Sequence, residues 1–267
     1  MEAMLNTIAH RSTHVSVIIP AHNEAKNLPY VLPQIPEWVH EVILVNDHSS
    51  DNTVEVARML LPTVRVVHTH NRGKGVALKT GFEAVTGDMI VTLDADGSND
   101  PRDIQHFVDA LLGGAYFALG SRLSAEGGSE DITQIRQCGA RFLIAVANGL
   151  FQMHFSDMFC GMNAFWRDCL DIFHIDCEGF EIETLMILRA CKANLKIAEV
   201  PCFEHARIHG TSNFRTLRDG WRVFRTIFKE WLIGRSVIET IKAPRTYLLN
   251  NGQWEVLAIS EHATIKQ

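Results

Sequence analysis

Short apolar runs alternate with helix-like stretches through residues 15–93, and this alternation limits the fold more than any other feature. Four runs have the length and composition of buried strands: Val15–Ile19, Glu41–Val45, Val64–His68 and Met89–Leu93. Three intervening stretches have helical spacing: 27–34, 53–60 and 76–85. This order predicts an α/β fold with a mostly parallel sheet covered by helices, with ligands at the carboxyl ends of the strands.

The fourth run ends in two carboxylates one residue apart, Asp94 and Asp96. Strand periodicity places both on the same side of the chain. Mg²⁺ or Mn²⁺ held by few protein carboxylates completes its shell with phosphate oxygens and water, so the pair suits a metal that carries a diphosphate. The alternative is that Asp96 to Asp100 form a turn and cap before a helix opened by Pro101.

Composition narrows the class of protein. A chain of 267 residues can bury a large core, and we expect one domain over residues 14–232, after a polar lead-in (1–13) and before a tail (233–267). The formal net charge of -6 argues against nucleic acid as a partner. The six cysteines lack CxxC or zinc-site spacing, which favours reduced thiols. Because a signal pattern and an apolar run of ~18 to 20 residues are both absent from the sequence, we expect a cytoplasmic protein that does not cross a membrane.

Two nucleotide-binding patterns are also absent from the sequence. Gly73-Lys74-Gly75 lacks the spacing of a P-loop, and the turn after the first strand lacks the Gly-x-Gly-x-x-Gly fingerprint of a dinucleotide site. A dehydrogenase is therefore disfavoured.

The later part of the chain continues the alternation, with elements predicted at 116–119, 135–151, 163–166, 184–192 and 196–200. The segment Leu217–Leu232 then carries aromatic residues at helical spacing, with basic residues between them. This pattern suits a peripheral contact at the cytoplasmic face of a membrane, and the alternative is an aromatic stripe packed on the sheet. Residues 247–259 are typical of a hairpin about an Asn-Asn-Gly turn.

Several motifs occur in a characteristic order: Ile19-Pro20-Ala21-His22-Asn23-Glu24, Asp47, Gly73-Lys74-Gly75, the Asp94/Asp96 pair, Gly120-Ser121-Arg122, Asp157 with Gly161, Phe180 to Glu183, Glu199-Val200-Pro201, Arg207 and Gly210-Thr211-Ser212-Asn213. This ordered set, over about residues 15–231, resembles the inverting glycosyltransferases of family 2, which have a GT-A fold. Within that family it is most similar to the polyprenol-phosphate sugar synthases.

The resemblance implies a role for particular residues. Contacts with a nucleotide-sugar donor are implied for Pro20, Ala21, Asn23, Glu24, Asp47, Arg72, Lys74, Asp94 and Ala95. Asp94 and Asp96 are implied to hold Mg²⁺ or Mn²⁺. Ser98 stands where the lipid-phosphate branch often has Gln, which makes it the candidate third ligand.

The same resemblance assigns Arg122, Arg136 and Arg207 to an anion pocket for the acceptor phosphate and the donor diphosphate. Planar guanidinium groups bind phosphate oxygens bidentately, which agrees with this assignment. The alternative for each arginine is a solvated surface position.

The acceptor decides whether a base is needed. A phosphate acceptor is already an anion at neutral pH, so positioning and charge stabilisation can suffice. An alcohol acceptor needs a general base, for which Asp157, Glu181 and Glu183 are candidates. The structural alternatives are that Asp157 caps a turn and that Glu183 caps the following helix.

We therefore expect an inverting, metal-dependent transferase that moves a sugar from GDP-mannose or a UDP-hexose to a polyprenyl or dolichyl phosphate. The alternative is transfer to a soluble hydroxyl acceptor in glycan or secondary-metabolite biosynthesis. A sugar nucleotidyltransferase is disfavoured because Pro20-Ala21-His22 replaces its Gly-rich basic loop. A non-catalytic module that binds a nucleotide-sugar or a membrane is disfavoured by the intact acidic pair. The sugar, the nucleotide base and the oligomeric state stay open.

Overall fold

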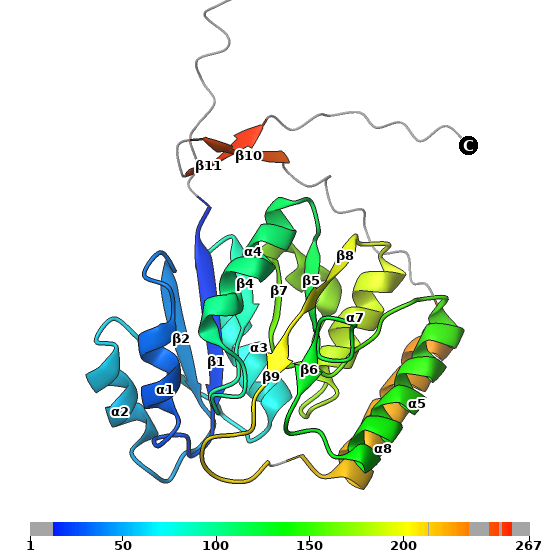
Figure 1. The fold of residues 1–267 in the computed structure, drawn as a ribbon, viewed down its shortest axis with the longest axis horizontal. Coiled ribbons are helices and arrows are strands. Elements are labelled where there is room, and N and C mark those ends of the chain that lie inside the picture. The colour runs from blue at the N-terminus through cyan, green and yellow to red at the C-terminus, as the bar shows by residue number, and fades with distance from the viewer. Residues whose placement is uncertain (1–12, 213, 235–245, 251–252, 258–267) are drawn as a thin grey trace, which may run out of the picture.

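The computed structural model describes residues 13–212 and 214–234, together with the backbone of residues 246–250 and 253–257. Seven strands form one sheet (Figure 1): β1 (Val15–Ala21), β2 (Glu41–Asn46), β3 (Arg65–His68), β4 (Met89–Thr92), β5 (Phe117–Ser121), β7 (Asn163–Trp166) and β8 (Ile197–Pro201). Their spatial order is β3-β2-β1-β4-β7-β5-β8. β7 is antiparallel to both neighbours, and the other pairs are parallel. The predicted mostly parallel sheet is confirmed.

Helices cover both faces of this sheet (Figure 1). One face packs against α1 (Leu28–Val31), α2 (Thr53–Leu60) and α4 (Ile104–Leu112). The other packs against α3 (Lys74–Ala84), α5 (Gln134–Phe151), α6 (Leu170–Phe173), α7 (Ile182–Lys192) and α8 (Thr216–Ile233). Shorter elements connect them: η2 (Leu32–Gln34), η3 (Pro101–Asp103), η4 (Arg167–Cys169), β6 (Gly128–Ser129) and β9 (Phe203–Glu204).

Strand β1 shows why the apolar runs form a buried sheet. Val17 and Ile19 belong to the core cluster on one face, whereas Ile18 belongs to the cluster on the other. Successive side chains of a strand point to opposite faces, so a strand covered on both faces needs an unbroken apolar sequence. The same reasoning applies to β2 and β4, whose described side chains are almost all buried.

The register of the central strands gathers their carboxyl ends at one edge. Ala21 at the end of β1 lies opposite Asn46 at the end of β2, and Ile18 lies opposite Thr92 at the end of β4. The residues that follow these strands therefore share one region of space. Asn23 and Glu24 follow β1, Asp47 follows β2, and the Asp94/Asp96 pair follows β4.

Beyond α8, β10 (Thr246–Asn250) and β11 (Gln253–Leu257) pair as antiparallel strands where a hairpin is predicted. Residues 251–252 and 258–259 of that hairpin, and residues 1–12 of the lead-in, lie outside the described residues. The division of the chain into lead-in, domain and tail stays a prediction. Among the helices of the described residues, none has the length and apolar character to cross a bilayer.

Candidate active site

A cavity of about 300 Å³ opens at the carboxyl ends of β1, β2 and β4. It is lined by Pro20, Ala21, His22, Glu24, Asp47, Arg72, Gly73, Lys74, Ala77, Asp94, Ala95, Asp96, Phe180, Arg207 and Ser212. Most residues implied to contact a nucleotide-sugar are therefore brought together in one place. The cavity also collects acidic and basic side chains from segments far apart in the sequence.

Asp94 lies against a basic side chain in this cavity. The Nζ of Lys74 is 3.0 Å from Asp94 Oδ1 and 2.8 Å from Glu183 Oε1. Burial of Lys74 opposes its charged form, but the two carboxylates outweigh burial and raise the pKa of the ammonium group. Lys74 therefore stays protonated and places a positive charge at the end of β4.

Asp96 has a matching partner in Arg207. The guanidinium of Arg207 lies 2.7 Å from Asp96 Oδ2 and 3.0 Å from Glu24 Oε1, so it bridges the turn after β1 and the turn after β4. Burial raises the pKa of the Glu24 carboxyl, and the hydrogen bond from Asn27 and the charge of Arg207 counteract that rise. Each carboxylate of the acidic pair thus faces a cation.

Asp47 organises the loop that precedes α3. Its Oδ1 accepts a hydrogen bond from the Thr69 hydroxyl at 3.0 Å, and its Oδ2 accepts one from the backbone N–H of Gly73 at 3.0 Å. Gly73 has a φ of 136°, and a Cβ there would lie 2.2 Å from the carbonyl oxygen of Glu178. The glycine is required because the chain before α7 passes directly over this turn.

Two predicted donor or metal contacts lie outside the lining of the cavity, and their hydrogen bonds support structural roles. Asn23, at a φ of 60°, accepts a hydrogen bond from the Ser50 backbone N–H at 2.7 Å and so joins the turns after β1 and β2. Ser98 is buried, and its backbone N–H donates to Asp96 Oδ1 at 3.0 Å. This bond orients Asp96, and the Ser98 carbonyl oxygen accepts a further hydrogen bond from the His205 backbone N–H at 2.8 Å.

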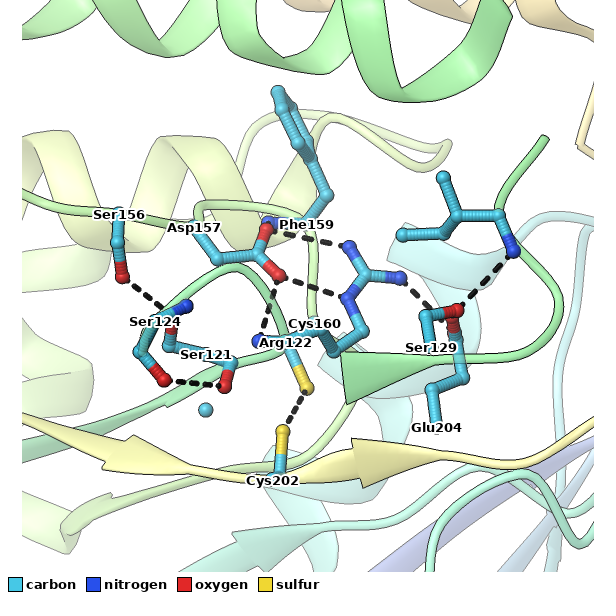
Figure 2. A network of polar contacts seen from close by, with 12 residues as sticks. Ser121, Arg122, Ser124, Ser129, Ser156, Asp157, Phe159, Cys160, Cys202 and Glu204 are labelled. Carbon is cyan, nitrogen blue, oxygen red and sulfur yellow. Dashed lines mark hydrogen bonds and ion pairs between the residues drawn. The ribbon is translucent and has the colours of Figure 1, made fainter. Parts of the chain in front are cut away.

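Arg122 and Asp157 also lie apart from the cavity, in the network drawn in Figure 2. The Nε of Arg122 donates to Asp157 Oδ2 at 2.8 Å, and its Nη1 donates to Glu204 Oε1 at 2.9 Å. Asp157 also accepts hydrogen bonds from the backbone N–H groups of Arg122 and Phe159. The guanidinium of Arg122 is thus paired with two protein carboxylates. This geometry favours a structural role, in which Arg122 holds the loop before β7 against the strand β9.

Arg136, Glu181 and Glu183 also lie outside the lining of the cavity. Arg136 directs its guanidinium to Phe214, whose carbonyl oxygen is 3.4 Å from Nη2, and so connects the first turn of α5 to the approach to α8. Glu183 lies within α7, where burial raises the pKa of its carboxyl and the charge of Lys74 counteracts the rise. Of the three arginines in the implied anion pocket, Arg207 alone lines the cavity.

Five lining residues were given no site role from the sequence: His22, Gly73, Ala77, Phe180 and Ser212. His22 lies between Ala21 and Glu24 in the turn after β1, so its position next to that strand end is the signal that could have identified it. Phe180 and Ser212 come from segments far from the first strands. Both stand in motifs of the family resemblance, Phe180 to Glu183 and Gly210-Thr211-Ser212-Asn213, and that membership is the signal that could have identified them.

The side chains at this site suit a divalent metal ion that takes only part of its coordination shell from the protein. Within the described part of the chain, no group of three or more His, Cys, Asp or Glu side chains could hold a metal ion. Asp94 and Asp96 nevertheless both line the cavity, which has room for further oxygen ligands. Two carboxylates suit Mg²⁺ or Mn²⁺ that takes its other ligands from a diphosphate and water, and they do not suit a closed site made of protein groups.

Helix α8 presents an aromatic face to the surroundings. Trp221 is 61% exposed and Leu217 is 90% exposed, whereas Val223 and Ile227 of the opposite face are buried. Consecutive rings stack along the helix, with 5.5 Å between the centroids of Trp221 and Phe224. The alternative in which this stripe packs on the sheet is wrong, because the buried face of α8 is made by other residues.

The sheet order, the covering helices and the acidic cavity at the strand ends define a GT-A type of fold. Comparison with known proteins then identifies the family: residues 16–173, more than half of the chain, match the family model described as Glycosyl transferase family 2. The chain therefore belongs to glycosyl transferase family 2.

Individual proteins are similar to the chain over most of its length. It is 29% identical over 235 residues to the low-salt glycan biosynthesis hexosyltransferase Agl6 of Haloferax volcanii, which covers 84% of this chain but 55% of that relative. It is 28% identical over 250 residues to the dolichol-phosphate mannosyltransferase of Pyrococcus furiosus, which covers 89% of this chain and 70% of that relative.

A solved structure shows the same fold. Glucosyl-3-phosphoglycerate synthase from Mycobacterium tuberculosis, in complex with Mn²⁺, UDP-glucose and phosphoglyceric acid, has a TM-score of 0.66 at 21% identity. The likeness covers 93% of this chain and 88% of that one.

Proposed function

We propose that the protein transfers a sugar from a nucleotide-sugar to a polyprenyl phosphate. The observation that carries the proposal is the placement of Asp94 and Asp96 beside Lys74 and Arg207 in one cavity at the strand ends. Two carboxylates and two cations at this place suit a diphosphate and a divalent metal better than a neutral ligand. The dolichol-phosphate mannosyltransferase among the relatives supports the lipid-phosphate acceptor by its name.

In this proposal Asp94 and Asp96 would hold Mg²⁺ or Mn²⁺, and the bound ion would supply positive charge to the departing diphosphate. Lys74 and Arg207 turn from the carboxylates toward phosphate oxygens and contribute further positive charge. An oxygen of the acceptor phosphate forms a bond to the anomeric carbon, and the bond from that carbon to the diphosphate oxygen breaks. Attack from the opposite side inverts the anomeric centre.

The carboxylates near the cavity are paired with cations, and this pairing favours a phosphate acceptor. Glu183, the favoured candidate base, is buried and paired with Lys74. Asp157 is enclosed in its contacts with Arg122, and Glu181, the third candidate, is buried with its Oε1 3.9 Å from the Nε of Arg222. An alcohol would need a free base to lose its proton, whereas a phosphate monoester has no such requirement. These pairings favour the lipid phosphate over a soluble hydroxyl acceptor.

The exposed face of α8 supports delivery of the acceptor at a membrane surface. Trp231, Leu232 and Ile233 continue the apolar stripe that begins at Leu217, and Phe142 of the adjoining helix α5 is exposed as well. Figure 1 shows α5 and α8 side by side at one end of the molecule. A basic helix with a continuous aromatic face suits the interface of an anionic bilayer.

The test is transfer of labelled sugar from GDP-mannose, UDP-glucose and UDP-N-acetylglucosamine, each with Mg²⁺ or Mn²⁺, with and without a polyprenyl phosphate. A lipid-soluble product from one donor supports the proposal. We expect Asp96→Asn to lower that transfer by about 100-fold or more, and Asp109→Asn on the exposed face of α4 to have no effect. Metal-dependent turnover of a donor without any lipid product would overturn the lipid acceptor and favour a soluble one.

A further inference from the structure

A second cavity of about 300 Å³ lies beside the first. The two cavities share Arg72, Gly73, Lys74 and Phe180. The second is completed by the chain before α7 and by the beginning of α8: Glu178, Gly179, Arg215, Arg218, Asp219 and Arg222. The two halves of this group are far apart in the chain, so local sequence predicts no site there.

This cavity has an excess of positive charge. Five of its lining residues are basic and two are acidic. Asp219 is buried and accepts a hydrogen bond from the Arg215 backbone N–H at 2.7 Å, so its carboxylate stabilises the first turn of α8. Within the described residues, Arg72 and Arg218 have no acidic side chain within ion-pair distance. Guanidinium groups left without carboxylates in a concave site favour a ligand with a phosphate group.

The same helix carries an apolar surface next to these arginines. Arg218 directly follows Leu217, and Arg222 directly follows Trp221, both of which are exposed. Adjacent positions on a helix are about 100° apart, so the basic groups border the apolar stripe. This arrangement matches a ligand that has an anionic head and an apolar tail.

The second cavity also adjoins the place where the donor would bind. Lys74 belongs to both linings, and its Nζ lies 5.8 Å from the centre of the Phe180 ring. Lys74 and Phe180 therefore stand between the two cavities. A phosphate group held by Arg72 and Arg218 would be next to the diphosphate of a donor in the first cavity.

We propose that the second cavity binds the phosphate group of a prenyl phosphate acceptor, with Arg72 and Arg218 around the phosphate and the prenyl chain along α8; Arg222 also lines the cavity, with its Nε 3.9 Å from Glu181 Oε1. This inference rests on the proposed transfer to a lipid phosphate. It moves the acceptor phosphate away from Arg122 and Arg136, whose guanidinium groups are used within the protein.

The test is binding of geranyl monophosphate, a water-soluble prenyl phosphate, to the full chain by calorimetry without any membrane. Arg218→Gln should weaken binding by about tenfold, which is the loss of one charge-assisted contact. Arg225→Gln, an exposed arginine two turns further along α8 and outside the cavity, should bind as the wild type does. Two further probes are tested separately. Binding of inorganic phosphate alone would indicate a simple anion site, and binding of geraniol alone would indicate a purely apolar site. A site for a prenyl phosphate needs both parts of the ligand.

Equal affinities for geranyl monophosphate in the Arg218→Gln and wild-type proteins would overturn the inference. A further variant, Arg136→Gln, would overturn it as well if it were the only one to lose affinity. Inorganic phosphate that binds as tightly as geranyl monophosphate would overturn the lipid assignment. The outcomes for the proposed function are separate. If the wild type binds the prenyl phosphate through Arg218 but makes no lipid product with any donor, the site stands and the transferase proposal fails. If transfer occurs and Arg218→Gln leaves its KM for the lipid unchanged, only the site fails.

Discussion

The Nζ of Lys74, in the first turn of α3, lies 2.8 Å from Oε1 of Glu183 in α7, and the Glu183 side chain is buried whereas that of Lys74 is partly exposed to the cavity. A carboxylate held by an ammonium group is poorly suited to remove a proton from a substrate. The same pair keeps a positive charge next to Asp94.

Glu183→Gln should therefore keep kcat for a phosphate acceptor within about tenfold of the wild-type value, because removal of a true general base costs roughly 10²- to 10⁴-fold. The measurement is kcat as a function of pH with the active donor. A drop beyond 100-fold together with loss of the acidic limb of the profile would identify Glu183 as the base.

Arg122 and Asp157 form a buried ion pair whose loss should appear in stability. We expect Arg122→Met to lower the free energy of unfolding by about 3 kcal/mol, because it leaves the Asp157 carboxylate buried without its partner. The double variant Arg122→Met/Asp157→Asn should be less destabilised than Arg122→Met alone, because the fully buried carboxylate of Asp157 is then replaced by a neutral amide. Urea unfolding measures both. A single variant of wild-type stability that has lost transfer activity would instead place Arg122 at the substrate.

Gly73 and Gly139 offer a matched pair of glycine substitutions. Gly73→Ala should destabilise the protein and lower activity, because the new Cβ would lie 2.2 Å from the Glu178 carbonyl oxygen at a φ of 136°. Gly139→Ala in α5, where a Cβ meets nothing within 4 Å, should raise the free energy of unfolding by about 1 kcal/mol. Thermal unfolding of both variants gives the comparison. Similar stabilities would contradict the close approach at Gly73.

Glu230 of α8 joins that helix to α7 through Arg189 and Lys192. Its carboxylate is 2.8 Å from each of these two cations. Burial opposes ionisation of Glu230, but the hydrogen bonds from Arg189 and Lys192 outweigh burial and lower the pKa of its carboxyl below 4.5. The resulting stabilisation is complete above the ordinary pKa and is lost as the pH falls through the lowered one.

Wild type should thus be more stable than Glu230→Gln near neutral pH, and the difference should shrink as the pH falls below about 4.5. Urea unfolding at a series of pH values measures this difference. A gap that stays constant across the acidic range would show that the charge of Glu230 does not contribute.

Trp221 should matter for attachment to a bilayer. Trp221→Ser should weaken sedimentation with phosphatidylglycerol vesicles by about tenfold, because burial of an aromatic side chain contributes ~1.5 to 3 kcal/mol. Trp38→Ser, which alters an exposed tryptophan in the loop before β2, is the control and should bind as the wild type does. If vesicles bind neither protein and Trp221→Ser converts a dimer to a monomer, the aromatic face is an interface between copies.

Local sequence was sufficient for the sheet and for its acidic edge. The runs that became β1, β2 and β4 are continuous and apolar because both of their faces are buried, and that requirement can be read without knowing their neighbours. Asp94 and Asp96 were recognisable for a related reason, since polar residues that end such a strand must lie at the rim of the sheet. The helix predicted at 53–60 and the strand predicted at 163–166 have the same bounds in the structure.

Tertiary structure decided which polar groups face the cavity and which face one another. The family resemblance assigns Arg122 and Arg207 to the same anion pocket. In the structure, Arg122 pairs with Asp157 and Glu204, whereas Arg207 pairs with Asp96. These partners are separated by 35 or more residues, so their pairing depends on the packing of loops that no local pattern specifies. The same holds for α8: its amphipathic sequence allowed the aromatic face to point inward, and packing of Val223 and Ile227 in the core turned that face outward.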